Sequence, residues 1–425
     1  MSNFAASLSG LTAASTAIDI VGNNISNLQT VGFKTSKARF ADVLAAAVPG
    51  GPPASVASAG VTTTIIRQND QGTIVESDNP LNMGISGLGF FRLDSNGEIT
   101  YTRDGRFQLG FDSTNPDKRF LENTQGRGVT GYLADYTTDP KGLIVTTAAP
   151  QEISFNATMP AKPSSSVFVA ANLNASTVPP TITTFDPADS RTYNDTTGTT
   201  TYDATGAAHD LRLYLVRAPS GNLWDIYSTM DNGTPTGPVN LSFDANGLMT
   251  GAMPLAAQTY GLGNGGSLSI ALDFTGSTMY GNPFSVESIT QDGWREGVID
   301  NTTKFRVGSD GVIQADYSNG RSRNVGQVVL ANFVNPDAMI GIGDSQWKAN
   351  ADPVSGTGKE ILDVPGRGLN GQGLGSVQGG AKEESNVDLN TELVALIEQQ
   401  RNYQASAQTF KILDQVLQNL TNLGK

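Results

Sequence analysis

The sequence offers few side chains that could do chemistry, and the histidine at position 209 is the most obvious of them. It is the single histidine of the chain, and it stands beside Asp210 in a strand-like segment. A lone histidine cannot build a multi-histidine metal site, and residue order alone does not identify a Ser-His-Asp triad. We therefore expect His209 to be a surface or packed residue rather than a catalytic one.

Other reactive arrangements are also missing from the sequence. It contains no P-loop, HExxH or GxSxG pattern. The acidic residues are scattered, so any glycosidase-like pair among them is unspecific. The stretch 94–98, DSNGE, lacks the spacing of a calcium loop, and GLGF at 87–90 lacks the third glycine and the helix of a dinucleotide loop. With no cysteine, thiolate chemistry is excluded. We expect no enzymatic activity, metal or cofactor; a secreted β-rich enzyme is a remote alternative.

Length and charge narrow the possible partners. The 425 residues suit two or three domains, and 40 acidic against 27 basic residues give a net charge of −13. This balance argues against nucleic-acid binding, which requires clustered Lys and Arg. No stretch approaches the roughly 20 apolar residues of a membrane span. The first basic residue is Lys34 and no apolar run precedes it, so we expect no cleaved signal peptide and no membrane insertion.

The elements that could carry a function are the two ends of the chain. Residues 385–425 contain no proline, and their apolar residues recur in alternating steps of four and three, a heptad pattern in which Gln400 is one polar member. The pattern predicts a long amphipathic helix, with Ser385 as the N-cap and Asp388 as a first-turn acid. Its apolar positions are Leu389, Leu393, Leu396, Tyr403, Phe410, Leu413, Leu417 and Leu420.

Residues 3–29 predict a second helix with the same period. Its apolar positions are Phe4, Leu8, Leu11, Ile18 and Ile25, and a flanking row of Ala14, Val21 and Leu28 widens the apolar stripe. Small residues at Ser15 and Gly22 would allow a neighbouring helix to approach closely. Because the two ends of one chain share one period, we predict that the helices pair as a coiled coil and that these apolar rows form an assembly interface.

The end of the first helix is unusually polar. Asn23, Asn24 and Asn27 are poor helix formers, and buried amides here could fix the register of packed chains, although solvent exposure is the simpler alternative. Gly32 is the expected helix terminator because it reaches positive φ freely. We expect Lys34, and the basic residues that follow it, to be solvated or to face the helix C-terminus.

Between the helices the sequence has the pattern of a β protein with many turns. Residues 84–111 and 304–333 alternate apolar and polar residues around four turn signals, namely Asn96-Gly97, Asp104-Gly105, Asp310-Gly311 and Asn319-Gly320. Two segments of one style, separated by about 190 residues, suggest a single β domain built from both sides of an insertion. Within the insertion, residues 209–228 predict a hairpin with Leu211, Leu213 and Leu215 on one face.

The predicted fold is therefore mainly β with long terminal α-helices and two nested β-rich domains. The helical domain comprises residues 1–70 and 372–425, the discontinuous β domain 71–149 and 283–371, and the inserted β domain 150–282. Residues 48–60 and 352–380, rich in Gly and Pro, are expected to be flexible connectors, and the role of 366–380 stays open.

The residues at both ends resemble a known family. GLTAASTAIDIVGNNISNLQTVGFKTSKARF and SNVDLNTELVALIEQQRNYQASAQTFKILDQVLQNL resemble the two terminal signatures of the flagellar axial proteins, which include rod, hook and hook-junction subunits. GLGFFRL, YTRDGRFQL, AHDLRLYLV and GQVVLANF resemble the hook subunits in particular. Rod subunits of the family are shorter and lack so large an insertion, which favours a hook subunit. A distal rod subunit is the alternative.

This resemblance implies a function. Subunits of this kind leave through the flagellar type III export apparatus without a cleaved signal and polymerise into a curved helical tube that transmits torque from rod to filament. The implied partners are further copies of the chain and the rod, hook-cap and hook-filament junction proteins. Paired terminal helices would line the inner tube, with the β domains outside, in an extracellular hook continuous with the basal body.

Overall fold

The computed structural model describes residues 2–44, 58–263, 265–299, 304–352, 356–367 and 374–423. The chain forms two compact units. Unit 1 comprises Met1–Ala157, Asp300–Asp316 and Ser322–Lys425, and unit 2 comprises Thr158–Ile299 and Tyr317–Arg321. The predicted three-way division differs from this, because the terminal helices and the first β region belong to one unit.

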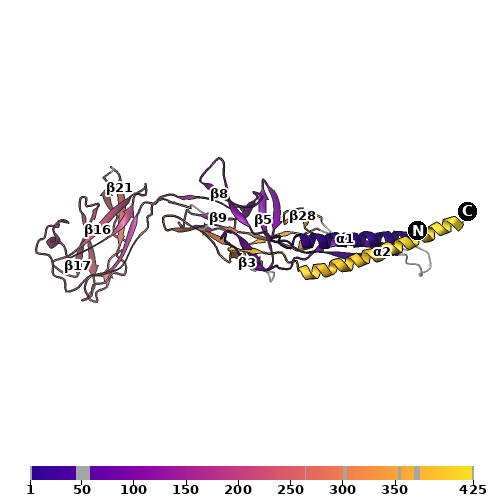
Figure 1. Cartoon of the computed structure of the whole chain (residues 1–425). Coiled ribbons are helices and arrows are strands. Elements are labelled where there is room, and N and C mark those ends of the chain that lie inside the picture. Colours follow the sequence, from indigo (N-terminus) through magenta and orange to yellow (C-terminus); the bar gives the residue numbers. More distant parts are fainter. Residues whose placement is uncertain are drawn as a thin grey trace. The chain divides into compact units, whose positions relative to one another are not determined.

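Both predicted terminal helices are present, as α1 (Ser2–Ser26) and α2 (Leu389–Leu423) (Figure 1). Helix α1 ends three residues earlier than expected, since the amide of Asn27 is shared between the carbonyls of Asn23 and Asn24, and the last turn tightens. Gly32 does take a positive φ of 69°, but in the turn beyond the helix.

The predicted cap of α2 needs correction. Asp388, not Ser385, is the N-cap residue, because its carboxylate accepts a hydrogen bond of 2.7 Å from the backbone amide of Thr391. These hydrogen bonds from Thr391 lower the pKa of Asp388. The hydroxyl of Ser385 lies outside the helix and accepts a bond from the amide of Val387 at 3.3 Å.

Unit 1 is built on a large, mostly antiparallel sheet, which has 15 strands in the part of the chain that the structure describes. These strands are β5 (Phe90–Ser95), β6 (Glu98–Thr102), β7 (Phe107–Phe111), β8 (Lys118–Asn123), β9 (Gly128–Asp135), β10 (Leu143–Ile144), β11 (Gln151–Glu152), β12 (Ser154–Asn156), β24 (Phe305–Val307), β25 (Val312–Asp316), β26 (Ser322–Val328), β27 (Leu330–Phe333), β28 (Ile340–Gly343), β29 (Gln346–Lys348) and β30 (Glu360–Asp363). Pairing of β9 with β26 joins the two predicted β segments in one sheet, as the sequence suggested.

Three short sheets complete unit 1. They pair β1 (Ser36–Leu44) with β2 (Ser58–Arg67), β3 (Ile74–Glu76) with β32 (Ala381–Glu383), and β4 (Met83–Ser86) with β31 (Ser376–Gly379). Each of the last two joins a strand from the first hundred residues to one in the stretch 376–383, shortly before α2. The region beside the helices is thus closed by both ends of the chain.

Three of the four predicted turns are confirmed. Asn96-Gly97, Gly311 and Gly320 take positive φ and connect paired strands. Asp104-Gly105 was wrongly predicted as a hairpin turn, since β6 pairs with β5 and β29 rather than with β7. Glycine is needed at 105 for another reason: a Cβ there would lie 1.7 Å from the carbonyl oxygen of Met83.

Unit 2 contains two larger sheets and one short pair. One sheet has the order β15-β16-β17-β18-β19, the other β20-β21-β14-β22, and β13 pairs with β23. The strands are β13 (Thr158–Met159), β14 (Ser166–Asn172), β15 (Asp195–Tyr202), β16 (Ala208–Arg217), β17 (Leu223–Met230), β18 (Thr236–Phe243), β19 (Met249–Thr250), β20 (Gln258–Gly261), β21 (Ser267–Asp273), β22 (Ser285–Gln291) and β23 (Gly297–Val298).

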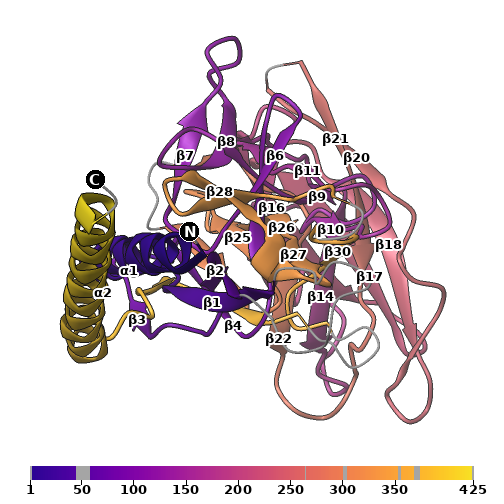
Figure 2. The same ribbon diagram turned by 90° about the vertical axis from the view of Figure 1, so that its right-hand side faces the viewer.

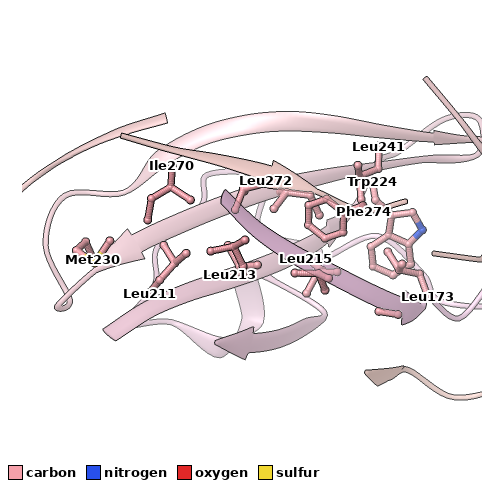
Figure 3. Close-up of a cluster of buried hydrophobic side chains, with 14 of the residues drawn as sticks. Leu173, Leu211, Leu213, Leu215, Trp224, Met230, Leu241, Ile270, Leu272 and Phe274 are labelled. Atoms are coloured by element: carbon pink, nitrogen blue, oxygen red, sulfur yellow. The ribbon is translucent and has the colours of Figure 1, made fainter. Parts of the chain in front are cut away.

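The core of unit 2 lies on the predicted hairpin. Leu211, Leu213 and Leu215 of β16 are all buried, and they pack in one apolar cluster with Trp224 of β17 and Leu272 of β21 (Figure 3). The period-2 alternation thus identified the buried face correctly.

The boundaries predicted for the inserted domain, 150 and 282, also need correction. The strands β11 and β12 lie after residue 150 but pair with β9 and β8 of unit 1. At the other end, β22 follows residue 282 and pairs with β14, so the unit continues to Ile299.

The two predicted connectors are only partly described. Residues 45–57 lie outside the described residues, so the prediction for 48–60 concerns mostly that gap. The second connector, 352–380, contains two regular strands: β30 pairs with β27, and β31 pairs with β4. Residues 353–355 and 368–373 of this stretch lie outside the described part.

Candidate assembly helices and their polar base

Helices α1 and α2 lie side by side and antiparallel (Figures 1 and 2). The C-terminal end of α1 is at the beginning of α2, where the side chain of Asn24 bonds that of Glu392. Towards the other end, a Cβ added to Gly10 would lie 3.9 Å from the hydroxyl oxygen of Ser406. Among the described side chains of α1, the buried apolar ones are small or β-branched, which suits close packing: Ala13, Ala14, Ala17, Ile20 and Val21.

The apolar rows predicted from the sequence are not the most buried faces of these helices. In α1, Leu8 is exposed, whereas Leu11, Ile18 and Ile25 are half-buried, as is Leu28 just beyond the helix. In α2, Leu396 and Phe410 are half-buried, and Leu389, Leu393 and Tyr403 are exposed. The side chains of Phe4, Leu413, Leu417 and Leu420 lie outside the described ones. The single chain therefore leaves much of the predicted apolar surface open to solvent.

Helix α2 carries a further apolar row that the sequence reasoning did not pick out. Val394 is 67% exposed, Ile397 53%, Ile412 60% and Val416 48%. Val394 and Ile412 are about five turns apart at 3.6 residues per turn, so they point the same way. Exposed apolar side chains in such a row mark a surface for another protein chain more often than a solvated face.

Asn24 is one of three neighbouring asparagines and the only one of them that is fully buried. Its Oδ1 accepts from the amide of Ser36 at 3.0 Å, and its Nδ2 donates to the Ser36 carbonyl at 2.8 Å and to Glu392 at 3.2 Å. The sequence left two alternatives for this amide, a buried contact that fixes the register of packed chains or exposure to solvent. Here it fixes α1 against the start of β1 and against α2 within one chain.

A buried charged cluster lies beneath the helices. Glu383 is fully buried; its Oε1 is 2.6 Å from the Nζ of Lys34 and its Oε2 is 3.1 Å from the Nη1 of Arg103. The amide of Gly72 also donates to Oε1 at 2.8 Å. Burial lowers the pKa of Lys34, an effect that the Glu383 carboxylate opposes, and burial likewise lowers the pKa of Arg103.

This cluster corrects the expectation that Lys34 is solvated. Its side chain is 1% exposed and holds two parts of the chain, because Nζ also donates to the carbonyl of Asp70 at 2.7 Å. Asn386 strengthens the same junction: Oδ1 accepts from the amide of Thr35 at 2.8 Å, and Nδ2 donates to the carbonyls of Gln68 and Asp70. We call residues 24, 34–36, 68–72, 103 and 383–392 the polar base of the helix pair.

His209 is packed between carboxylates. Its Nδ1 lies 2.6 Å from Oδ2 of Asp231, and its Nε2 lies 3.5 Å from Oδ2 of Asp203. Burial tends to lower the pKa of His209, but hydrogen bonds to Asp231 and Asp203 outweigh burial and raise it. The pKa of Asp203 is about 2, chiefly because of the Thr205 hydroxyl. His209 thus ties turns of unit 2 together.

Two further kinds of site are absent from the described residues. Among the described residues, no group of three or more His, Cys, Asp or Glu side chains is placed to hold a metal ion. In the same part of the chain, neither helix has an apolar stretch long enough to cross a membrane.

Comparison with known proteins gives matches at both ends and in the middle of the chain. Residues 4–34 match the family model described as flagella basal body rod protein, and 378–423 match the C-terminal model of the flagellar basal body rod FlgEFG proteins. Residues 172–294, within unit 2, match the flagellar basal body protein FlaE D2 domain.

Two full-length relatives decide the family. The flagellar hook protein FlgE of Escherichia coli is 36% identical over 99% of both chains, and that of Salmonella typhimurium is 35% identical over 99% of this chain and all of its own. The chain belongs to the FlgE flagellar hook protein family. The structure of Helicobacter pylori FlgE2 shares the fold, with a TM-score of 0.50 and 15% identity over 72% of this chain and 99% of that one.

The FlgE family explains where the matched regions lie. The two rod-type models cover most of α1 and all of α2, together with part of the polar base. The D2 model covers most of unit 2. The terminal helices therefore match the rod-type models. Unit 2 matches the D2 model instead.

Proposed function

We propose that this chain is the structural subunit of the bacterial flagellar hook, where many copies assemble into a curved tube that transmits torque from rod to filament. The observation that carries the proposal is the 36% identity to a flagellar hook protein over 99% of both chains. Identity on this scale includes both terminal helices and unit 2, so the whole architecture corresponds. In this role the chain acts without catalysis or cofactor.

The exposed apolar rows support self-assembly. Burial of exposed apolar side chains of a helix against another copy is favourable. It stabilises the assembly by roughly 1.5–3 kcal/mol for each side chain that becomes fully buried. We assign the assembly interface to the predicted rows of both helices and to the second row of α2. The helices would complete a coiled coil and line the inner tube only when neighbours are present.

The proposal includes specific partners. Besides further copies, these are the rod, hook-cap and hook-filament junction proteins and the flagellar type III export apparatus, with export that requires no cleaved signal peptide. The subunit would stand in the extracellular hook, continuous with the basal body. The matches to rod-type models at both ends support a join to rod proteins built from similar helices.

A distal rod subunit is the second candidate, because both terminal matches are to rod-type models. The match of residues 172–294 to the D2 domain favours the hook. Complementation separates the two: the gene should restore hooks and motility to a strain that lacks its hook protein. Restoration in a strain that lacks a distal rod protein instead would support the rod.

A double variant of α2 tests the assembly surface. Val394→Asp with Ile412→Asp places two charges on the exposed row, so we expect monomers with unchanged unfolding but no filaments in electron micrographs. The matched control is Val178→Asp in unit 2, where the side chain is 76% exposed and away from the helices in sequence. Normal filaments from the double variant would refute the assignment of this row.

A further inference from the structure

A pocket of about 610 Å³ lies in unit 1 beside the polar base. Its walls come from the C-terminal end of α1, from Arg67 at the end of β2, and from the hairpin of β28 and β29. Asn23 and Asn27 stand on the helix side, and Trp347 stands on the hairpin side. This pocket is separate from the apolar rows of the helices that we assign to the assembly interface.

Arg67 is the unusual residue of the pocket. Its guanidinium carbon lies 4.8 Å from the centre of the Trp347 ring, and Nη1 is buried without a hydrogen-bond acceptor. Among the described residues, no carboxylate oxygen lies within 4.0 Å of the guanidinium nitrogens of Arg67. The carboxylate of Asp337 accepts a bond of 2.7 Å from Asn69, and its charge raises the pKa of Arg67 less than burial lowers it.

The neighbouring cations make the contrast clear. Lys34, which also lines the pocket, and Arg103 both reach the carboxylate of Glu383. Burying a cationic N–H without an acceptor costs free energy that a partner would recover. The planar guanidinium offers N–H donors in a fork that matches a carboxylate, and its cation–π contact with Trp347 supplies none of them with an acceptor.

The rim of the pocket indicates what kind of molecule supplies that carboxylate. Strand β28 is the edge of the large sheet, and its Gly341 and Gly343 line the pocket. The two isoleucines of the same strand point elsewhere and are 53% (Ile340) and 42% (Ile342) exposed. An exposed edge strand with apolar side chains is a template for pairing with another polypeptide rather than a site for a small anion.

We propose that this pocket is a contact site for a second copy of the chain, which inserts an Asp or Glu side chain whose carboxylate accepts hydrogen bonds from Arg67. The inference rests on the proposed self-assembly. It also fits the charge of the chain, since 40 acidic residues against 27 basic ones leave many surface carboxylates without cationic partners in a single copy.

The first test separates assembly from folding. Arg67→Gln removes a partly buried cation whose Nη1 has no acceptor, so the monomer should melt at the same temperature or higher. The critical concentration for polymerisation should instead rise at least about tenfold, the effect of a lost charged hydrogen bond. Arg67→Lys should restore part of the loss. The control is Arg212→Gln in unit 2, an exposed ion pair with Asp210. A lower monomer melting temperature with an unchanged critical concentration would overturn the proposal.

The second test identifies the occupant. The chain has no cysteine, so Asp344→Cys creates a unique attachment point at the mouth of the pocket for a benzophenone cross-linker. On irradiation of polymers, we expect cross-links to one acid-containing segment of another copy, and none in dilute monomer. Polymers that form normally but give only intramolecular products would overturn the pocket proposal and leave the hook proposal intact. If the unmodified protein forms no polymer at all, the hook proposal itself fails.

Discussion

Unit 2 and the helix pair use opposite means to hold their parts together. In unit 2 the strands bury an apolar cluster around Leu213 and Trp224, and both of these side chains are fully buried within the single chain. The helices instead leave Val394, Ile397 and Ile412 exposed and are attached to the sheet by buried amides and charges. Unit 2 thus buries its core within one chain, and we propose that other copies complete the helix pair.

The largest effect should come from the charged attachment. Glu383→Gln leaves both Lys34 and Arg103 buried without a negative partner, so we expect the free energy of unfolding of unit 1 to fall by about 3–5 kcal/mol. Urea unfolding followed by circular dichroism at 222 nm reports this loss, because the described α-helices both belong to unit 1.

The matched control for that variant is Glu98→Gln. Glu98 pairs with Arg127 and Lys348 at the surface of the same unit, and screened surface ion pairs contribute little to stability. If both variants unfolded at the same urea concentration, the charged cluster would not be what fastens the helices to the sheet.

An apolar truncation in unit 2 should have the next largest effect. Leu213→Ala removes buried methyl groups from the middle of β16 and leaves a cavity, for a loss of about 3 kcal/mol in the unfolding free energy of unit 2. The emission of Trp224, in the same cluster, reports the transition (Figure 3). Leu248→Ala is the control, since that leucine is 51% exposed. Equal losses from the two variants would contradict the core assignment.

These two regions also differ in how far the sequence predicted them. The hairpin with Leu211, Leu213 and Leu215 was predicted because a strand buries every second residue, a signal contained in a few neighbouring positions. The long helices were predicted for the same reason, from a local period. Such patterns reveal which elements exist and which of their faces are apolar.

The polar base was not predictable in this way. Lys34, Arg103 and Glu383 are far apart in the sequence, and no local period links a basic residue to an acidic one about 350 positions later. Lys34 was placed in solvent because most lysines are there. The buried face of α1 was predicted only in part: Ala14 and Val21 belong to the predicted flanking row, but Ala13 and Ala17 do not. Alanines are weak hydrophobic signals that become informative only when the neighbouring helix is known.

A smaller effect should separate the two candidate caps of α2. Asp388→Ala removes the acceptor for the Thr391 amide and should cost about 1 kcal/mol in the stability of the helix pair, whereas Ser385→Ala should change it little. Helix content at 222 nm, measured against temperature, compares the two variants. A larger loss for Ser385→Ala would restore the cap that the sequence suggested and contradict the observed one.

The smallest effect concerns the contact of His209 with Asp231 and Asp203 in unit 2. The pKa of His209 is raised by Asp231 and Asp203, and Asp210 and Arg212 lie in the same network. A raised pKa in the folded state means that the stabilising contribution of His209 is complete below its ordinary value of about 6.5 and is lost as the pH rises through the folded value. The carboxylates stay ionised in this window, because the pKa of Asp231 is lowered and that of Asp203 is about 2.

We therefore expect unit 2 to lose stability from pH 6 upward in the unmodified protein but not in His209→Gln. The imidazole resonances of this single histidine give its pKa directly by NMR, and a value at or below 6.5 would show that burial outweighs the two aspartates.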